Sequence, residues 1–146
     1  MFKTFIFSTL LFVGVSAQAG WAGDWTGFAT YTLNNGETST ETVIVSLKKE
    51  ETLIALAESF FKESLILTVH GNELLMSDKV VGTFTEDKLS IAYDIHVDVL
   101  EETCRQAYEV SSTEGGITYV DLFTCPQGYS SKLEGILKSG KKFAIR

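Results

Sequence analysis

The chain has 146 residues, with 12 Lys and Arg, 19 Asp and Glu, and a formal net charge of −7 at neutral pH. Phosphate backbones and anionic lipid surfaces repel such a chain, so nucleic-acid binding and docking on a membrane surface are disfavoured. A hydrophobic content of 45% excludes disorder, and the length suits one domain with a real core.

Residues 1–19 have the layout of a secretory signal peptide. Lys3 supplies a positive charge, the run from Phe5 to Val15 is mostly apolar, and Ala17-Gln18-Ala19 is a small-x-small cleavage site. The apolar run is shorter than the roughly 20 residues that span a bilayer, so we expect a cleaved signal rather than a membrane anchor. An outer-membrane barrel is a further alternative, but the many charges in the predicted turns and strands argue against it, so we expect a protein that is not embedded in a membrane. We predict a secreted or periplasmic protein whose single domain spans residues 20–146. Loss of Lys3 changes its net charge from −7 to −8.

The first strand is expected within Gly20–Thr32. Trp25, Ala29 and Tyr31 share one face of it, because side chains alternate along an extended chain. A large ring at the head of a strand, followed by small residues on the same face, suits the closed mouth of a barrel. We therefore predict that Trp25 is a buried structural plug and that Trp21, which precedes the strand, is the more exposed of the two.

Hairpin signals recur along the rest of the chain at a spacing of roughly ten residues. Strand-like runs flank the turn pairs Asn35-Gly36, Gly71-Asn72, Glu86-Asp87, Glu114-Gly115 and Ser139-Gly140. A long antiparallel meander has two exposed edges, and closing into a barrel removes them. The pattern predicts an all-β protein with an antiparallel up-and-down barrel of about 8–10 strands.

Two segments also have helical features. Residues 47–63 are rich in helix formers, and residues 97–105 place apolar side chains at helical spacing. We favour a strand over Thr52–Phe60, and we leave a short helix open in either segment.

The two cysteines are predicted to form a disulfide. If Glu114-Gly115 is a two-residue turn, Thr113 faces Gly116, and counting outward along the hairpin brings Cys104 opposite Cys125. The count also makes them a non-hydrogen-bonded pair, in which the Cα atoms lie about 4.5 Å apart, within reach of a disulfide. Export would place the chain in a compartment where disulfides persist.

Motifs for catalysis are absent. Asp94, His96 and Asp98 share one face of an extended strand, where two carboxylates and an imidazole are candidates for a metal or for a catalytic base. The opposite face is apolar, so a solvated polar face explains the alternation more simply. The sequence contains no Gly-x-Ser-x-Gly, His-Glu-x-x-His, Cys-x-x-Cys or phosphate-binding glycine loop. We expect neither an enzyme nor a bound metal or cofactor.

Gly23-Asp24-Trp25, at the head of the first strand of an export-signalled meander, resembles the calycin superfamily of lipocalins, avidins and bacterial lipocalin-like domains. A divergent bacterial lipocalin-like β-barrel is the closest description. In these families the Trp plugs the closed end of the barrel and a basic residue of a late strand packs across it. The resemblance implies these roles for Trp25 and for Arg146, or else Arg105. The Thr-Asp-Tyr motif of lipocalins proper is absent, and no clear long C-terminal helix follows.

A barrel of this kind can hold one small ligand, and a non-enzymatic binder of a small apolar ligand is the expected function. Six aromatic residues are candidates for the lining: Phe28, Phe84, Tyr93, Tyr108, Tyr119 and Phe123. Most of these rings would serve equally as plain core, because a narrow barrel is filled by its own side chains. The alternative is an exported protein-binding module, such as an enzyme inhibitor, that acts through hairpin loops like Asn34–Glu37 or Pro126–Ser131.

Overall fold

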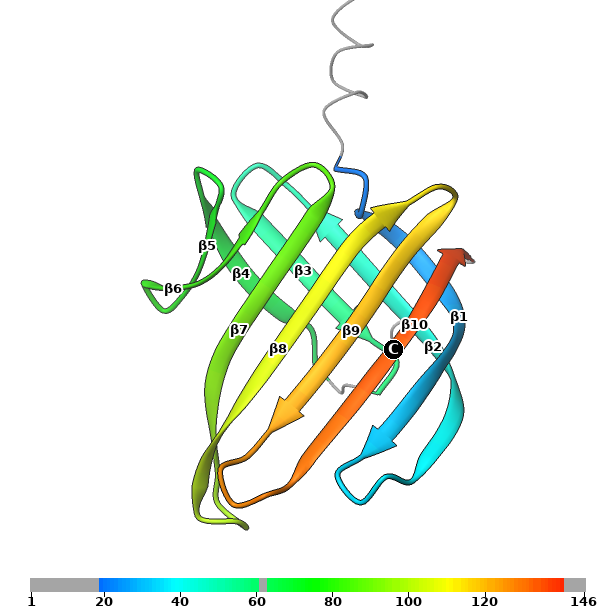
Figure 1. Ribbon diagram of the computed structural model, residues 1–146. Helices are drawn as coiled ribbons and strands as arrows, with labels where there is room; N and C mark the ends of the chain where they lie inside the picture. Colours follow the sequence, from blue (N-terminus) through cyan, green and yellow to red (C-terminus); the bar gives the residue numbers. More distant parts are fainter. Residues whose placement is uncertain (1–18, 61–62, 141–146) are drawn as a thin grey trace, which may run out of the picture.

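The computed structural model describes residues 19–60 and 63–140, which form a closed antiparallel β-barrel (Figure 1). In chain order the strands are β1 (Gly23–Leu33), β2 (Thr38–Lys49), β3 (Leu53–Glu58), β4 (Leu65–His70), β5 (Glu73–Met76), β6 (Lys79–Phe84), β7 (Lys88–Val97), β8 (Glu102–Thr113), β9 (Gly116–Thr124) and β10 (Ser130–Ser139). Each strand pairs with the next, and β10 pairs with β1. The predicted all-β, up-and-down barrel is confirmed.

The helical alternatives are wrong for the part of the chain that the structure describes. Residues 53–58 form β3, inside the strand favoured over Thr52–Phe60, and residues 97–105 form the end of β7, a turn and the start of β8. β3 has β2 on one side and β4 on the other, so its backbone groups are satisfied between strands. Its inward side chains Ile54 and Leu56 are buried. Pairing and burial outweigh the helix propensity of this segment.

The last predicted hairpin, at Ser139-Gly140, needs a strand over residues 141–145, which lie outside the described residues. β10 has β9 on one side and β1 on the other. After β10, the Gly140 N–H donates to the Asp24 carbonyl at 3.0 Å. The other four turn pairs lie between consecutive strands, as predicted.

One half of the barrel is filled with apolar side chains. Alternate residues of β2, such as Val43, Val45 and Leu47, point inward and are almost fully buried. They pack in one cluster with residues that lie near the turns of the same end, including Leu89 and Ile117. The core therefore lies toward the end at which β1 begins and β2 ends.

This end is closed by Trp21, which occupies the position predicted for Trp25. The Trp21 side chain is fully buried, its indole N–H donates to the Thr85 carbonyl at 2.8 Å, and its ring meets Phe84 edge-on at 6.3 Å. Trp25 is only half-buried, and its indole N–H donates to the Trp21 carbonyl at 2.9 Å. The expectation that Trp21 is the more exposed of the two is wrong. The segment before β1 folds across the barrel end, where the Gly20 N–H donates to the Glu86 carbonyl at 2.8 Å.

Of the two basic residues proposed to pack across the tryptophan, the structure describes Arg105, which does not take that role. Arg146 lies outside the described residues. Arg105 is on the outer surface and pairs with Asp94, with 3.0 Å between the guanidinium nitrogen and the carboxylate oxygen.

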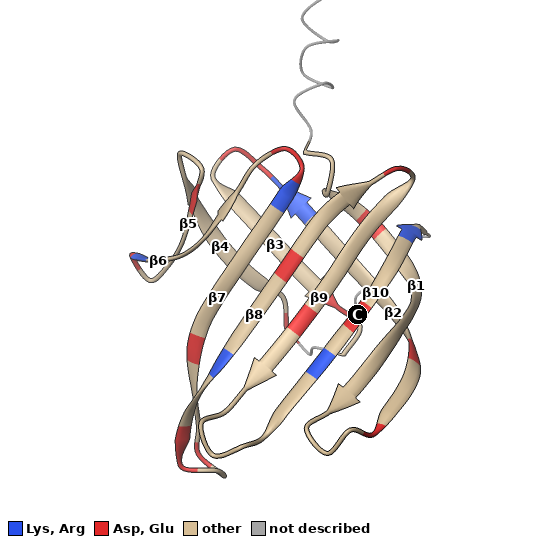
Figure 2. Ribbon diagram, viewed as in Figure 1, with Lys and Arg blue, Asp and Glu red and all other residues tan. Residues whose placement is uncertain are grey.

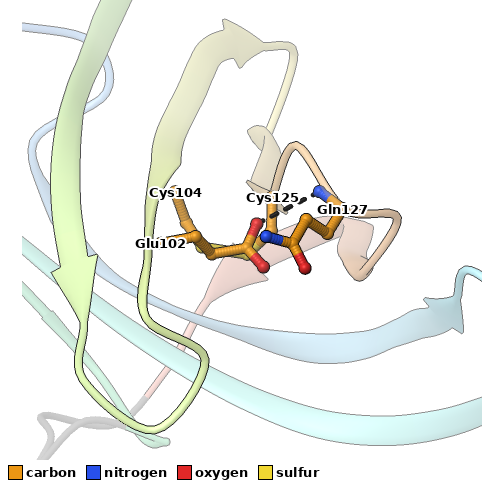
Figure 3. Close-up of a disulfide and its surroundings, with 4 residues drawn as sticks. All are labelled: Glu102, Cys104, Cys125 and Gln127. Carbon is orange, nitrogen blue, oxygen red and sulfur yellow. Dashed lines mark hydrogen bonds between the residues drawn. A yellow bond between two sulfur atoms is a disulfide. The ribbon is translucent and has the colours of Figure 1, made fainter.

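The opposite end of the barrel, which we call the open end, carries the disulfide. Cys104 and Cys125 are bonded, with 4.3 Å between their Cα atoms, as the hairpin count predicted. The neighbouring residues Arg105 and Thr124 face each other, in the register that the hairpin count assumed from Thr113 and Gly116. Beside the disulfide, the Gln127 N–H donates to Glu102 Oε1 at 3.1 Å, which fixes the loop after β9 (Figure 3).

The burial of the two tryptophans predicts their contributions to stability. Trp21→Ala removes a fully buried ring and should lower the free energy of unfolding by about 3–5 kcal/mol. Trp25→Ala should cost clearly less, because that ring is only partly buried. Urea unfolding of both variants measures the difference. A larger loss in Trp25→Ala would contradict the assignment of Trp21 as the plug.

Candidate functional site

The open half of the barrel contains a cavity of about 740 Å³, which we call the open-end cavity. Part of its wall is apolar or aromatic, and these residues are Tyr31, Leu33, Phe60, Phe123 and Leu133. The rest is polar or acidic, and these residues are Glu37, Thr38, Ser39, Glu41, Glu58, Gln106, Asp121 and Ser131. The cavity is therefore amphipathic, and its charged groups in the described lining are all carboxyls.

Strand alternation explains why polar side chains point into the barrel. On β9, Tyr119, Asp121 and Phe123 lie two residues apart and therefore face the same side. On β8, Gln106 lies in phase with Cys104 and opposite Phe123. Asp121 and Gln106 thus continue the inward rows that are apolar elsewhere in the barrel.

A hydrogen-bonded cluster links these polar groups at the inner wall of the cavity. Glu58 is only 2% exposed, and the Tyr119 hydroxyl donates to its Oε2 atom. The Gln106 side-chain amide donates to Asp121 Oδ1 at 2.6 Å and to the Leu122 carbonyl at 3.3 Å. The Glu58 and Asp121 carboxyls are also hydrogen-bonded to each other, and we call them the Glu58–Asp121 pair.

The pair shares one proton and one negative charge near neutral pH. Burial, and then the charge of Asp121, raise the pKa of Glu58 from 4.5 to about 8, against the opposing effect of the Tyr119 hydrogen bond. Burial also raises the pKa of Asp121, while hydrogen bonds from Gln106 and Glu58 favour its ionised form. Two carboxyls hydrogen-bond to each other only when one of them is protonated. Glu58 therefore carries the proton, and Asp121 carries the charge.

That charge has no basic partner in the described lining of the cavity. Lys and Arg are absent from those lining residues, and Glu37 and Glu41 add two further carboxyls at the rim. A charge in a low-dielectric site is costly unless it is paired, so this wall favours a cationic group in the cavity.

A second cavity of about 560 Å³ lies beside the first, on the side of β4 and β7. Its lining shares Phe60 and Gln106 with the open-end cavity. Tyr93 and Tyr108 line it and have hydrogen-bonded hydroxyls. We call it the side cavity.

The structure brings several of the predicted aromatic residues to these cavities. Phe123 lines the open-end cavity, and Tyr93 and Tyr108 line the side cavity. Tyr119 is fully buried between them and the core, where it contacts Glu58.

Two of the predicted lining residues lie elsewhere. Phe28 is 73% exposed because it falls on the outward face of β1, so its assignment to the lining is wrong. Phe84 lies at the closed end against Trp21 and is not among the residues that line either cavity, so its assignment to the lining is also wrong.

Sequence reasoning missed Glu58, Gln106 and Asp121, although the sequence contains a signal for them. Glu58 follows Ile54 and Leu56 at intervals of two, and Asp121 stands in the same phase as Tyr119. A carboxylate in phase with a buried row marks an interior polar site.

The predicted metal candidates do not converge. His96 Nε2 lies 3.4 Å from Asp98 Oδ1, but Asp94 pairs with Arg105 on the outer surface. Among the described residues, one group has ligand atoms within 4.8 Å of one another, namely Glu102, Cys104 and Cys125. Its sulfurs are already bonded to each other.

Comparisons of the chain with protein-family models, with curated proteins and with solved structures find no match. In the described part of the chain, no helix has the length and apolar character needed to cross a membrane.

The raised pKa of Glu58 predicts a pH dependence of stability. The folded chain holds a proton on Glu58 up to about pH 8, whereas the unfolded chain releases it near 4.5. This contribution to stability is fully present below pH 4.5 and is lost as the pH rises through about 8. Glu58→Gln cannot ionise, so it should flatten the fall in the free energy of unfolding over this range.

Urea unfolding of the parent and of Glu58→Gln across this pH range makes the measurement. Glu134→Gln is a matched control, because Glu134 is exposed on β10 and pairs with Lys132. An unchanged pH dependence in Glu58→Gln would contradict the protonated state assigned to Glu58.

Proposed function

We propose that this protein is an exported, non-enzymatic binding barrel that holds a small, mainly apolar molecule with one protonated amino group in the open-end cavity. The observation that carries the proposal is the buried Glu58–Asp121 pair, whose negative charge meets no basic side chain in the described lining. The closed antiparallel barrel is compatible with a calycin-like fold, which supports the proposal of a lipocalin-like binder.

The size and walls of the cavity support an apolar ligand body. A volume of about 740 Å³ lies within the range of pockets that enclose small molecules. Phe60, Phe123 and Leu133 provide apolar contact area on different strands or loops around the opening. Burial of apolar ligand surface against them supplies the main part of the affinity.

The inner wall supports a cationic group on the ligand. Asp121 accepts hydrogen bonds from Gln106 and Glu58, and it is a half-buried residue of the cavity lining. An ammonium group placed there would donate to the carboxylate in a site of low dielectric, where such bonds are strongest. Neutral Glu58 adds no second charge, which suits a ligand with a single positive charge.

A non-enzymatic role is consistent with the residues that line the cavity. The described lining contains no His or Cys, the side chains that most often act as base and nucleophile at neutral pH. Glu58 is engaged by Tyr119 and Asp121, which hold it in a fixed orientation.

Binding of decylamine, decanol and decanoate, which share one apolar chain, tests the proposal. At neutral pH decylamine should bind at least about tenfold more tightly than decanol, and decanoate should bind most weakly. Isothermal titration calorimetry, below the micelle concentration of each compound, gives the three dissociation constants. Asp121→Asn should remove the advantage of the amine and leave decanol binding unchanged.

Glu134→Gln is the matched control, because it removes one negative charge from the outer surface of β10 and should leave all three affinities unchanged. Equal binding of decanol and decylamine would refute the proposed preference for a protonated amino group. Failure of all three compounds to bind would refute the binding function.

A further inference from the structure

All ten strands pair into a closed barrel, but the wall between β4 and β7 has an opening toward the open end, because the pairing through β5 and β6 is short. β7 spans Lys88–Val97 but pairs with β6 only over Leu89–Ile91. Residues 92–97 of β7 have β8 on one side, and among the described residues they have no partner strand on the other. On the other side of the opening, β4 pairs with β5 only over Thr68–His70, so residues 65–67 have no partner on that side within the described part of the chain.

Local geometry turns the β5–β6 hairpin away from this part of the wall. The register of the two strands shifts between Leu74 and Leu75, which bends the pair. Ser77 and Asp78 then form a tight turn, both with positive φ, of 49° and 67°. Figure 1 shows the β5–β6 hairpin leaving the wall, while β7 continues toward the open end with β8 beside it.

The opening leads into the side cavity, whose lining includes apolar side chains on both sides of the opening. Tyr93 and Ile95 of β7 and Leu65 of β4 point toward it and are half-buried rather than buried. Equivalent inward positions in the closed half, such as Leu89 and Ile91, are at most 1% exposed. Tyr93, Ile95 and Leu65 are partly exposed because β5 and β6 do not cover this part of the wall.

The outer surface around the opening is acidic. Asp94 and His96 point outward from β7, and Asp98 follows with a side chain that is 95% exposed. Glu63 is exposed on the far side of the opening. Figure 2 shows acidic positions on the lower part of β7 and at its turn to β8. Arg105 of β8 pairs with Asp94, whereas the Asp98 side chain is almost fully exposed.

We propose that the free edge of β7 over residues 92–97 binds an extended segment of a partner protein, which adds one strand to the barrel and alternates apolar with basic side chains. An unpaired strand edge is a template for such addition, because its backbone N–H and C=O groups point outward. Side chains of the added strand alternate between the two faces. One set would enter the side cavity beside Tyr93 and Ile95, and the other would lie near Asp94 and Asp98.

A second copy of this chain is a poorer occupant. Antiparallel pairing of two β7 edges would place the acidic residues Asp94 and Asp98 of both copies along one joint, where like charges destabilise the pair. An added strand with basic side chains would instead pair favourably with these acidic residues.

Fluorescence anisotropy with a labelled peptide, Lys-Val-Lys-Val-Lys-Val-Lys, tests the proposal on the full mature chain. The peptide should bind, and a peptide of the same composition with its three Val residues adjacent should bind at least about tenfold more weakly. N-methylation of every second amide distinguishes strand addition from charge attraction. Methyl groups on the amides that face β7 should abolish binding, and methyl groups on the other set should leave it in place.

Two protein variants complete the experiment. Asp98→Lys should weaken binding, because it reverses a charge beside the edge, and Glu134→Lys, on β10, should not. Asp98 is almost fully exposed, so its substitution leaves the fold intact.

Equal binding of the two N-methylated peptides, or of the regular and rearranged peptides, would overturn the proposal in favour of charge attraction alone. If sedimentation shows that the chain self-associates and that the self-associated form does not bind the peptide, the edge belongs to a second copy of the chain. This result would also overturn the proposal. Neither result depends on whether the open-end cavity binds an amine.

Discussion

Pairing of β1 with β10 is the contact on which the rest of the structure depends. It joins residues more than a hundred positions apart in sequence, such as Trp25 with Ser139 and Thr30 with Glu134, and it converts a meander with two edges into a closed wall. Closure creates an inside. Once an inside exists, the alternation of each strand decides which side chains leave water, and a one-residue slip in any register would reverse that choice.

The two halves of the barrel interior differ in the side chains that they bury. Toward the closed end, aliphatic side chains and Trp21 fill the space, and the Trp21 indole N–H is satisfied by the Thr85 carbonyl. Toward the open end, Glu58, Gln106 and Asp121 interrupt the aliphatic rows, and the space between them is not filled. A buried carboxyl stays neutral or finds a partner, and here one proton shared by the Glu58–Asp121 pair removes half of the charge. The remaining charge gives the cavity its chemical preference.

The side opening has a related physical origin. Eight strands continue into the open half while β5 and β6 end early, so the wall there is short of two strands. Natural β-proteins protect such edges with charges or bulges. Here the bulge in β5–β6 moves those strands away from the edge rather than covering it, and the charges stand on the outer face of β7. The edge of β7 therefore keeps its backbone groups available between an apolar cavity and an acidic surface.

Local pattern in the sequence determined the fold class, most of the turns and the Cys104–Cys125 disulfide. Strand period and turn residues act between near neighbours, so counting along one hairpin was sufficient to place the cysteines. Tertiary structure decided which tryptophan closes the barrel, because the segment before β1 folds over a distant turn and carries Trp21 to Thr85. It also decided that Glu58 meets Tyr119 across 61 positions of sequence, since only closure brings β3 and β9 to face each other. Phase along a strand marks a side chain as inward, whereas its partner across the barrel is fixed by the number of strands and their register.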